Sequence, residues 1–472
     1  MSFAAPLFLW YFLPAVLLAS WILPHRARNG VLAVFSLGFY AVGGKEFVLL
    51  LLALIAVNYA AGLAIGALPL RRRKAVVVAT VLADLAVLAV WKYAGFASTA
   101  VSSIASSLGL GDTRVVSLAL PIGISFFTFH HLSYVVDVYR GVRPPMRNPL
   151  TFVTYIAMFP QLVAGPIVRY HEIADQLNDA RRDRLADFAE GFPRFAWGLF
   201  KKVAIADSLA PIADAAFASP DPSTSTAWIG ALAYTGQIYF DFSGYSDMAI
   251  GLGMMFGLRL PENFARPYSA ISVTDFWRRW HQSLSRWFRD YLYVPLGGNR
   301  GGTFRTYRNL SIVFLTTGLW HGAAWTFVIW GAFHGLLLII ERATGLGSSD
   351  RWAGPRRAIT FLLVVFGWVL FRAESLPAAG RMLQAMVTPE GWSIAPDVAV
   401  LLSGHRILLL VLVLASTLLP ATWVTGRVID GLQDNTPVWA RRSVRGIAVA
   451  LAPYAGIVAV AGTFSPFLYF QF

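Results

Sequence analysis

The chain has 472 residues, of which 57% are hydrophobic and 14% are charged, and its mean hydropathy is +0.58. A soluble protein carries roughly 25% charged residues, so this composition excludes an ordinary soluble protein and indicates a polytopic membrane protein. The formal net charge is +14 and the sequence contains no cysteine, which excludes disulfides and thiolate metal sites. The basic residues lie between apolar stretches, where membrane topology explains them better than a nucleic-acid partner does.

The N-terminal part of the chain predicts a series of membrane crossings with alternating loops. The apolar stretches are 7–23, 31–42, 47–68 and 75–94. Arg26 and Arg28 follow the first stretch, and residues 71–74 (RRRK) follow the third. Because loops rich in lysine and arginine stay in the cytoplasm, we expect the N-terminus to face outward.

The rest of the chain continues this pattern. Further crossings are expected at 115–138, 192–209, 228–258, 310–340, 359–371, 407–424 and 447–462. The stretch 310–340 fits one span or a helical hairpin, so the total is about 11 crossings. Residues 151–168 contain Pro160 and Pro166 between basic flanks, which predicts a re-entrant element. No internal repeat or soluble domain is evident, so residues 1–472 are expected to form a single polytopic domain.

A segment rich in tryptophan and arginine follows at residues 276–293. On a helix, its large apolar side chains share one face, and the opposite face carries Arg278, Arg279, Arg286 and Arg289. This pattern predicts an amphipathic helix at the cytoplasmic interface, whose arginines either anchor it to lipid headgroups or bind an anionic ligand. His281 lies at the edge of the apolar face, where a lipid anchor does not need an imidazole.

His321 lies near the middle of the apolar stretch 310–340. Burial disfavours a charged imidazole, and a neutral one can act as a general base toward a hydroxyl. We favour catalysis over the alternative, a hydrogen bond across a helix interface, because ionisable residues inside membranes are generally functional. His334 can share a face with His321 only if Gly322 breaks the helix, and we expect a structural role for His334.

A metal site is not expected, because no carboxylate lies at helical spacing from His321 and no HExxH motif occurs. The glycine-rich segment 297–302, with Asn299 and Arg300, lacks the P-loop lysine; it fits either an anion site, such as one for a coenzyme A phosphate, or a flexible turn.

The acidic residues Asp241 and Asp247 lie inside the apolar stretch 228–258. Buried carboxylates usually pair with arginine, so we expect a structural role for both, with Arg278 or Arg289 as the partner.

Several long tracts have an unusual composition that points to one family. The longest are residues 276–300 (FWRRWHQSLSRWFRDYLYVPLGGNR) and 318–342 (GLWHGAAWTFVIWGAFHGLLLIIER), with shorter ones at 121–129, 159–167, 241–251, 260–268 and 306–310. Together they resemble the membrane-bound O-acyltransferase family, in the bacterial alginate O-acetyltransferase branch that is related to the D-alanyl transfer protein of teichoic acid modification. The resemblance covers roughly residues 119–373.

The resemblance implies an all-α integral membrane protein, with tilted helices in a ring around a central tunnel. The invariant histidine of the family corresponds to His321 and its second polar position to His281, which makes these two the expected catalytic residues. The resemblance also implies an acyl thioester donor, acetyl-CoA, that enters from the cytoplasmic side, and no tightly bound cofactor. The expected substrate-binding residues are Arg278, Arg279, Arg289, Asn299, Arg300, Trp320 and His334.

The implied activity is transfer of an acyl group to or across the bacterial cytoplasmic membrane, for O-acetylation of an extracellular polysaccharide. Family members usually work with a separate extracytoplasmic acetyltransferase, so such a partner is expected, while the acceptor polymer stays open. A transporter or lipid flippase, with polar residues lining a substrate path, is the alternative, although the sequence lacks the inverted repeat of such proteins.

Overall fold

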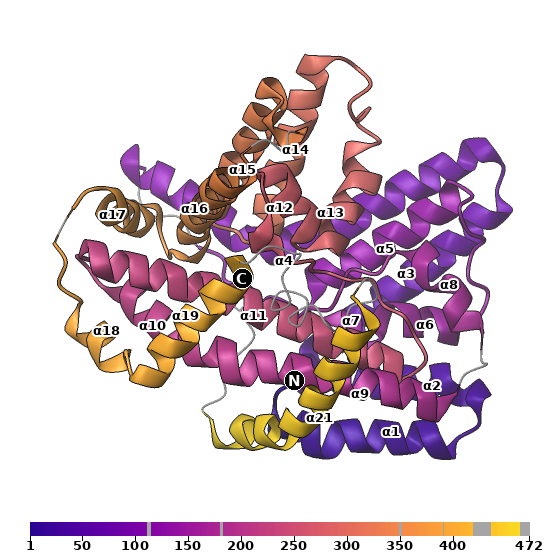
Figure 1. Ribbon diagram of the computed structural model, residues 1–472. Coiled ribbons are helices and arrows are strands. Elements are labelled where there is room, and N and C mark those ends of the chain that lie inside the picture. Colours follow the sequence, from indigo (N-terminus) through magenta and orange to yellow (C-terminus); the bar gives the residue numbers. More distant parts are fainter. Residues whose placement is uncertain (111–114, 180–182, 349–351, 390, 419–435, 463–472) are drawn as a thin grey trace. The chain divides into compact units, whose positions relative to one another are not determined.

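The computed structural model describes residues 1–110, 115–179, 183–348, 352–389, 391–418 and 436–462. All regular secondary structure in these ranges is helical, which confirms the all-α expectation (Figure 1). The chain divides into two compact units. Unit 1 comprises Met1–Phe192 and Ala249–Pro261, and unit 2 comprises Pro193–Met248 and Glu262–Phe472.

Unit 1 contains the N-terminal helices. They are α1 (Leu13–Ile22), α2 (Arg28–Gly44), α3 (Val48–Ala67), α4 (Leu70–Ser107), α5 (Ile124–Tyr139), α6 (Pro149–Ala157), α7 (Phe159–Leu162) and α8 (Tyr170–Asn178). Helices α3 and α4 are separated at Pro69, which precedes the first residue of α4, because proline lacks the N–H that a helix interior needs. Gly62 lets α3 approach α5, since a Cβ there would lie 2.2 Å from the hydroxyl of Tyr134.

The segment 151–168 has the broken backbone that its prolines predict. Helix α6 ends at Ala157, α7 is a single short turn, and residues 165–169 are not helical. Nearly every side chain of this segment is buried, as an irregular backbone at membrane depth requires. Its insertion from one side of the membrane stays a prediction.

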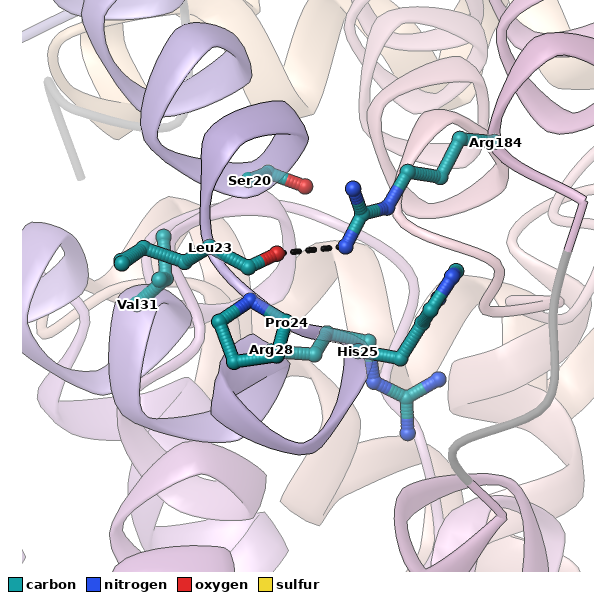
Figure 2. Close-up of a pocket in the computed structure, with 7 residues that line it drawn as sticks. All are labelled: Ser20, Leu23, Pro24, His25, Arg28, Val31 and Arg184. Carbon is teal, nitrogen blue, oxygen red and sulfur yellow. Dashed lines mark hydrogen bonds between the residues drawn. The ribbon is translucent and has the colours of Figure 1, made fainter.

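A small hollow lies where α1 ends (Figure 2). Arg184 donates a hydrogen bond to the carbonyl of Leu23 there, and Arg28, also at the hollow, donates to the carbonyls of Gln176 and Leu177 at the end of α8. Both guanidinium groups thus satisfy carbonyls that a helix end leaves without partners. The hollow has a volume of about 10 Å³, which fits about one water molecule and is too small for a substrate.

Unit 2 contains the remaining helices. Helix α9 (Arg184–Phe200) enters it at Pro193, and α11 (Thr224–Met255) belongs to it as far as Met248. The others are α10 (Asp207–Ala218), α12 (Val273–Arg279), α13 (Gln282–Phe288), α14 (Thr303–His321), α15 (Trp325–Thr344), α16 (Ala353–Arg372), α17 (Leu376–Val387), α18 (Pro396–Leu401), α19 (Gly404–Leu418) and α21 (Val438–Ala461).

The stretch 310–340 forms a hairpin rather than one span. Helices α14 and α15 lie side by side (Figure 1), and Gly322 between them has extended backbone angles. A Cβ at Gly318 would lie 2.3 Å from the carbonyl oxygen of Phe327, and a Cβ at Gly331 would lie 2.4 Å from that of Phe314. The two glycines therefore allow the close backbone approach that small residues give to helix pairs in membranes.

The expectation of one amphipathic helix over 276–293 is wrong. Helix α12 ends at Arg279, and α13 begins at Gln282. His281 between them has φ 44° and ψ 54°, in the left-handed backbone region that residues other than glycine rarely adopt. Hydrogen bonds to residues 263–265 replace the helical ones: Gln282 N donates to the carbonyl of Asn263, and Ala265 N donates to the carbonyl of Arg279.

The membrane crossings are supported in part. Among the described residues, five stretches are long and apolar enough to cross a membrane: His25–Ala67, Leu70–Ser107, Trp325–Thr344, Ala353–Arg372 and Val438–Ala461. The total of about 11 crossings, the ring with its tunnel and the single domain over 1–472 stay predictions. The C-terminal end of the crossing expected at 407–424 lies outside the described residues.

Candidate active site

The two predicted catalytic histidines lie against the same tryptophan in unit 2. The ring of His281, at the break between α12 and α13, lies 6.1 Å from that of Trp320, centroid to centroid. The ring of His321, the last residue of α14, lies 4.9 Å from the same indole. The fold thus brings together two imidazoles from separate helical segments.

His321 is enclosed by aromatic rings. Besides Trp320, its imidazole contacts Trp330 of α15 at 5.1 Å and Phe371 of α16 at 5.2 Å, both nearly perpendicular, and its residue is 4% exposed. A neutral imidazole is the form that can take a proton from a hydroxyl.

His281 is fully buried. Its ring stands edge-on to Phe242 of α11 at 4.7 Å, and its Nδ1 lies 3.1 Å from the side-chain oxygen of Asn263. Burial lowers the pKa of His281 to about 3, so this imidazole is neutral at pH 7. The sequence did not single out Asn263, which lies within the tract 260–268 but carries no spacing signal of its own.

His334 lies near His321 and contacts one of the same aromatic rings. Its ring lies 5.1 Å from Trp330, the indole that His321 also contacts, so the break at Gly322 does bring the two histidines to one tryptophan. Trp277 Nε1 donates to His334 Nδ1 at 3.3 Å. Because an indole N–H can only donate, the proton of neutral His334 is on Nε2. These contacts fit the expected structural role, and substrate binding by His334 stays a prediction.

The predicted donor-binding side chains have different surroundings. Arg279 forms an ion pair with Asp275 at 2.8 Å, and Arg289 forms one with Asp290 at 2.7 Å. Arg278, Asn299 and Arg300 are exposed, and Arg278 has no ion pair among the described residues. Substrate binding by these five residues stays a prediction.

A cavity of about 180 Å³ lies among α12, α13, α14 and α15. Its walls include Trp277, Phe288 and Phe314, and Arg278 is the one charged side chain that lines it. Trp277 connects this cavity to the histidine cluster, because it also donates to His334.

The predicted partners of the buried carboxylates are wrong. Asp247 pairs with Arg194 at 2.6 Å and Lys201 at 2.7 Å, and Asp241 pairs with Lys202 at 2.8 Å. Neither Arg278 nor Arg289 takes part. The basic residues come from α9 and the π-helical turn after it, which run along α11.

The sequence did carry a signal for these ion pairs. The predicted crossing 192–209 holds three basic residues, and 228–258 holds the two carboxylates. Glycines let the two segments touch, because a Cβ at Gly198 would lie 2.5 Å from the carbonyl oxygen of Gly244. Complementary charges in successive apolar stretches therefore predict partners better than the nearest arginine-rich segment does.

Comparison with known proteins identifies the family of the chain. A model of the membrane-bound O-acyltransferase family matches residues 114–375. The Azotobacter vinelandii protein described as "Probable alginate O-acetylase AlgI" is 45% identical over 504 residues, which cover 100% of both chains. A Helicobacter pylori peptidoglycan O-acetyltransferase is 39% identical over 432 residues, covering 83% of this chain and 81% of its own. A Bacillus subtilis teichoic acid D-alanyltransferase is 28% identical over 277 residues, covering 54% and 69%.

The chain belongs to the membrane-bound O-acyltransferase family, which confirms the resemblance drawn from its motifs. It is an O-acyltransferase, and the transporter alternative gains no support. The catalytic and substrate-binding roles of individual residues stay predictions.

Proposed function

We propose that the chain transfers an acetyl group from cytoplasmic acetyl-CoA to or across the cell membrane, for O-acetylation of an extracellular polysaccharide. The observation that carries this proposal is the full-length similarity to alginate O-acetylases. The shorter similarity to a peptidoglycan O-acetyltransferase supports the acetyl group and a polysaccharide acceptor as well. The buried histidines at Trp320 supply groups suited to acyl transfer.

In the proposed reaction, His321 acts as the general base. Its neutral imidazole takes the proton of the acceptor hydroxyl while the oxygen attacks the thioester carbonyl. The tetrahedral intermediate then expels the coenzyme A thiolate, and the imidazolium returns the proton to sulfur. Aromatic rings around His321 exclude water, which would otherwise compete as the acceptor. His281 binds the acceptor group beside it, and Trp320 separates and orients the two imidazoles.

The donor approaches from the arginine-rich side in this proposal. Arg278, Asn299 and Arg300 are exposed and available for the phosphates of coenzyme A. Arg279 and Arg289 already hold carboxylates, so they contribute at most a diffuse positive potential. The protein sits in the bacterial cytoplasmic membrane with its N-terminus outside, and a separate extracytoplasmic acetyltransferase passes the acetyl group to the polymer.

The test uses the purified full-length protein in sealed lipid vesicles, with acetyl-CoA labelled in the acetyl group on one side and the polysaccharide or the partner protein on the other. We expect release of free coenzyme A together with label on a polysaccharide or on the partner protein. In cells, deletion of the gene removes the O-acetyl groups of the exported polymer. Label that crosses the membrane still attached to coenzyme A would contradict acyl transfer and support transport.

A further inference from the structure

Asn263 lies at the centre of a buried polar cluster. It is 1% exposed, and its side-chain oxygen Oδ1 faces the backbone N of Ser283 at 3.3 Å, the hydroxyl of Ser283 at 2.7 Å and His281 Nδ1 at 3.1 Å. Its Nδ2 donates to the hydroxyl of Ser246 in α11 at 3.0 Å.

These contacts settle which end of the amide faces His281. The backbone N–H of Ser283 can only donate, so the atom that faces it must be the amide oxygen. The opposite end then donates to Ser246, whose hydroxyl can accept. Both sides of the amide are satisfied in this orientation, and a flipped amide would place two donors against each other.

The orientation of the amide determines the tautomer of His281. An amide oxygen only accepts, so the Nδ1 of His281 must carry the hydrogen in the 3.1 Å contact. A neutral imidazole has one N–H, and Nε2 is therefore the ring atom with the lone pair. His334 has the opposite tautomer, because Trp277 donates to its Nδ1.

The backbone of Asn263 stabilises the break between α12 and α13. The carbonyl of Asn263 accepts from Gln282 N at 2.9 Å, directly after the left-handed His281. Both the backbone and the side chain of Asn263 therefore act on His281. The backbone maintains the conformation that places the imidazole beside Trp320, and the side chain determines which ring nitrogen carries the hydrogen.

We propose that Asn263 is a positioning residue that fixes His281 as the Nδ1–H tautomer, so that His281 accepts a hydrogen bond through Nε2 during acyl transfer. The effect on transfer rests on the proposed function, whereas the tautomer does not. In this tautomer, His281 Nε2 accepts a hydrogen bond from the hydroxyl of the acceptor. The same atom carries no hydrogen and therefore cannot donate to the oxyanion of the tetrahedral intermediate.

The tautomer is measured by nitrogen NMR on full-length protein with ¹⁵N-labelled histidine, and the signal of His281 is assigned by its loss in His281→Gln. We expect a protonated Nδ1 and an unprotonated Nε2 at pH 7.5. A protonated Nε2 in the wild-type protein would overturn the proposal, whether or not the protein transfers acetyl groups.

Three variants test the role of Asn263. In Asn263→Leu, we expect a mixture of tautomers and at least a tenfold loss in kcat. In Asn263→Asp, the acceptor oxygen is kept, so the Nδ1–H tautomer and the transfer at high pH are retained. The new carboxylate raises the pKa of His281, so the acidic limb of the rate profile moves to higher pH by at least one unit. The control Ser246→Ala removes only the hydrogen bond of Asn263 Nδ2 and should keep the Nδ1–H tautomer of His281.

An unchanged tautomer in Asn263→Leu, or an unshifted profile in Asn263→Asp, would overturn the positioning role. If the wild-type protein shows the Nδ1–H tautomer but no acetyl transfer, the proposed function fails and the assignment of the tautomer stands. If Asn263→Leu does not fold, the wild-type spectrum still tests the tautomer of His281, and the pH profile of Asn263→Asp still tests the positioning role of Asn263.

Discussion

The imidazole of His281 lies 6.1 Å from the indole of Trp320, centroid to centroid, and the imidazole of His321 lies 4.9 Å from the same indole. A left-handed residue places His281 at the break between α12 and α13, whereas His321 follows Trp320 directly in sequence and is the last residue of α14. Trp320 is thus the contact shared by two histidines from separate helical segments.

Replacement of Trp320 tests this shared contact. Trp320→Phe keeps an aromatic ring beside both histidines, and we expect acetyl transfer within about threefold of wild type. Trp320→Ala leaves a space beside both rings, admits water and lowers the rate by about tenfold to a hundredfold, as misplaced reacting groups do. The measurement is the initial rate of transfer from labelled acetyl-CoA. Equal rates in Trp320→Ala and wild type would contradict the role of the indole.

The glycine contact of the hairpin predicts a loss of stability. In Gly318→Val, the new side chain overlaps the backbone of α15 at Phe327, so the free energy of unfolding should fall by about 1–3 kcal/mol or more. The measurement is thermal unfolding in detergent. The control Gly354→Ala, at a position with no atom within 4 Å of the new Cβ, should leave Tm nearly unchanged, and an equal shift in both variants would refute the close approach.

The buried ion pairs predict a second stability effect. Asp247→Ala removes the carboxylate that Arg194 and Lys201 both contact, which leaves Lys201 without its ion pair, while Arg194 keeps its ion pair with Glu262 at 2.7 Å. Removal of one partner from a buried ion pair costs about 3–5 kcal/mol. We expect a large drop in Tm and in the yield of folded protein. The exposed Asp221→Ala serves as the control and should behave as wild type; a wild-type Tm for Asp247→Ala would show that the pairs contribute nothing.

His281 predicts a dependence of stability on pH. Its folded pKa of about 3 lies below the ordinary value of 6.5, so between these values the unfolded state binds the proton and the folded state does not. The contribution of His281 to the free energy of unfolding is therefore fully present above pH 6.5. It falls as the pH drops, by about 2 kcal/mol at pH 5. The free energy of unfolding of His281→Gln should lack this part of the pH dependence. The same pH slope in variant and wild type would contradict the buried neutral ring.

Hydropathy and charge predicted the helical class and many of its elements. The apolar stretch 228–258 is α11, and 359–371 lies within α16. Gly318 and Gly331 of the stretch 310–340 form the hairpin contact, and the proposed site histidines lie at one cluster. These features follow from composition and local pattern, which the sequence carries directly.

The helix break at His281 could not be predicted in the same way. Helical periodicity continues through residues 276–293, and the break depends on hydrogen bonds to Asn263 and Ala265, which lie outside that window. The long-range contacts of Asn263 override the local helical preference there. The partners of Asp241 and Asp247 were missed for a different reason, because the complementary charges of the successive apolar stretches 192–209 and 228–258 were not matched with each other.

The most direct test of the central claim is the rate of acetyl transfer by His321→Ala. Wild type, His321→Ala and the control His405→Ala, which changes an exposed histidine in α19, are purified in identical nanodiscs and supplied with labelled acetyl-CoA and acceptor. General-base catalysis by His321 predicts a loss of about a hundredfold or more in His321→Ala, with normal folding, and no loss in His405→Ala. A wild-type rate in His321→Ala would contradict the assignment of His321 as the base.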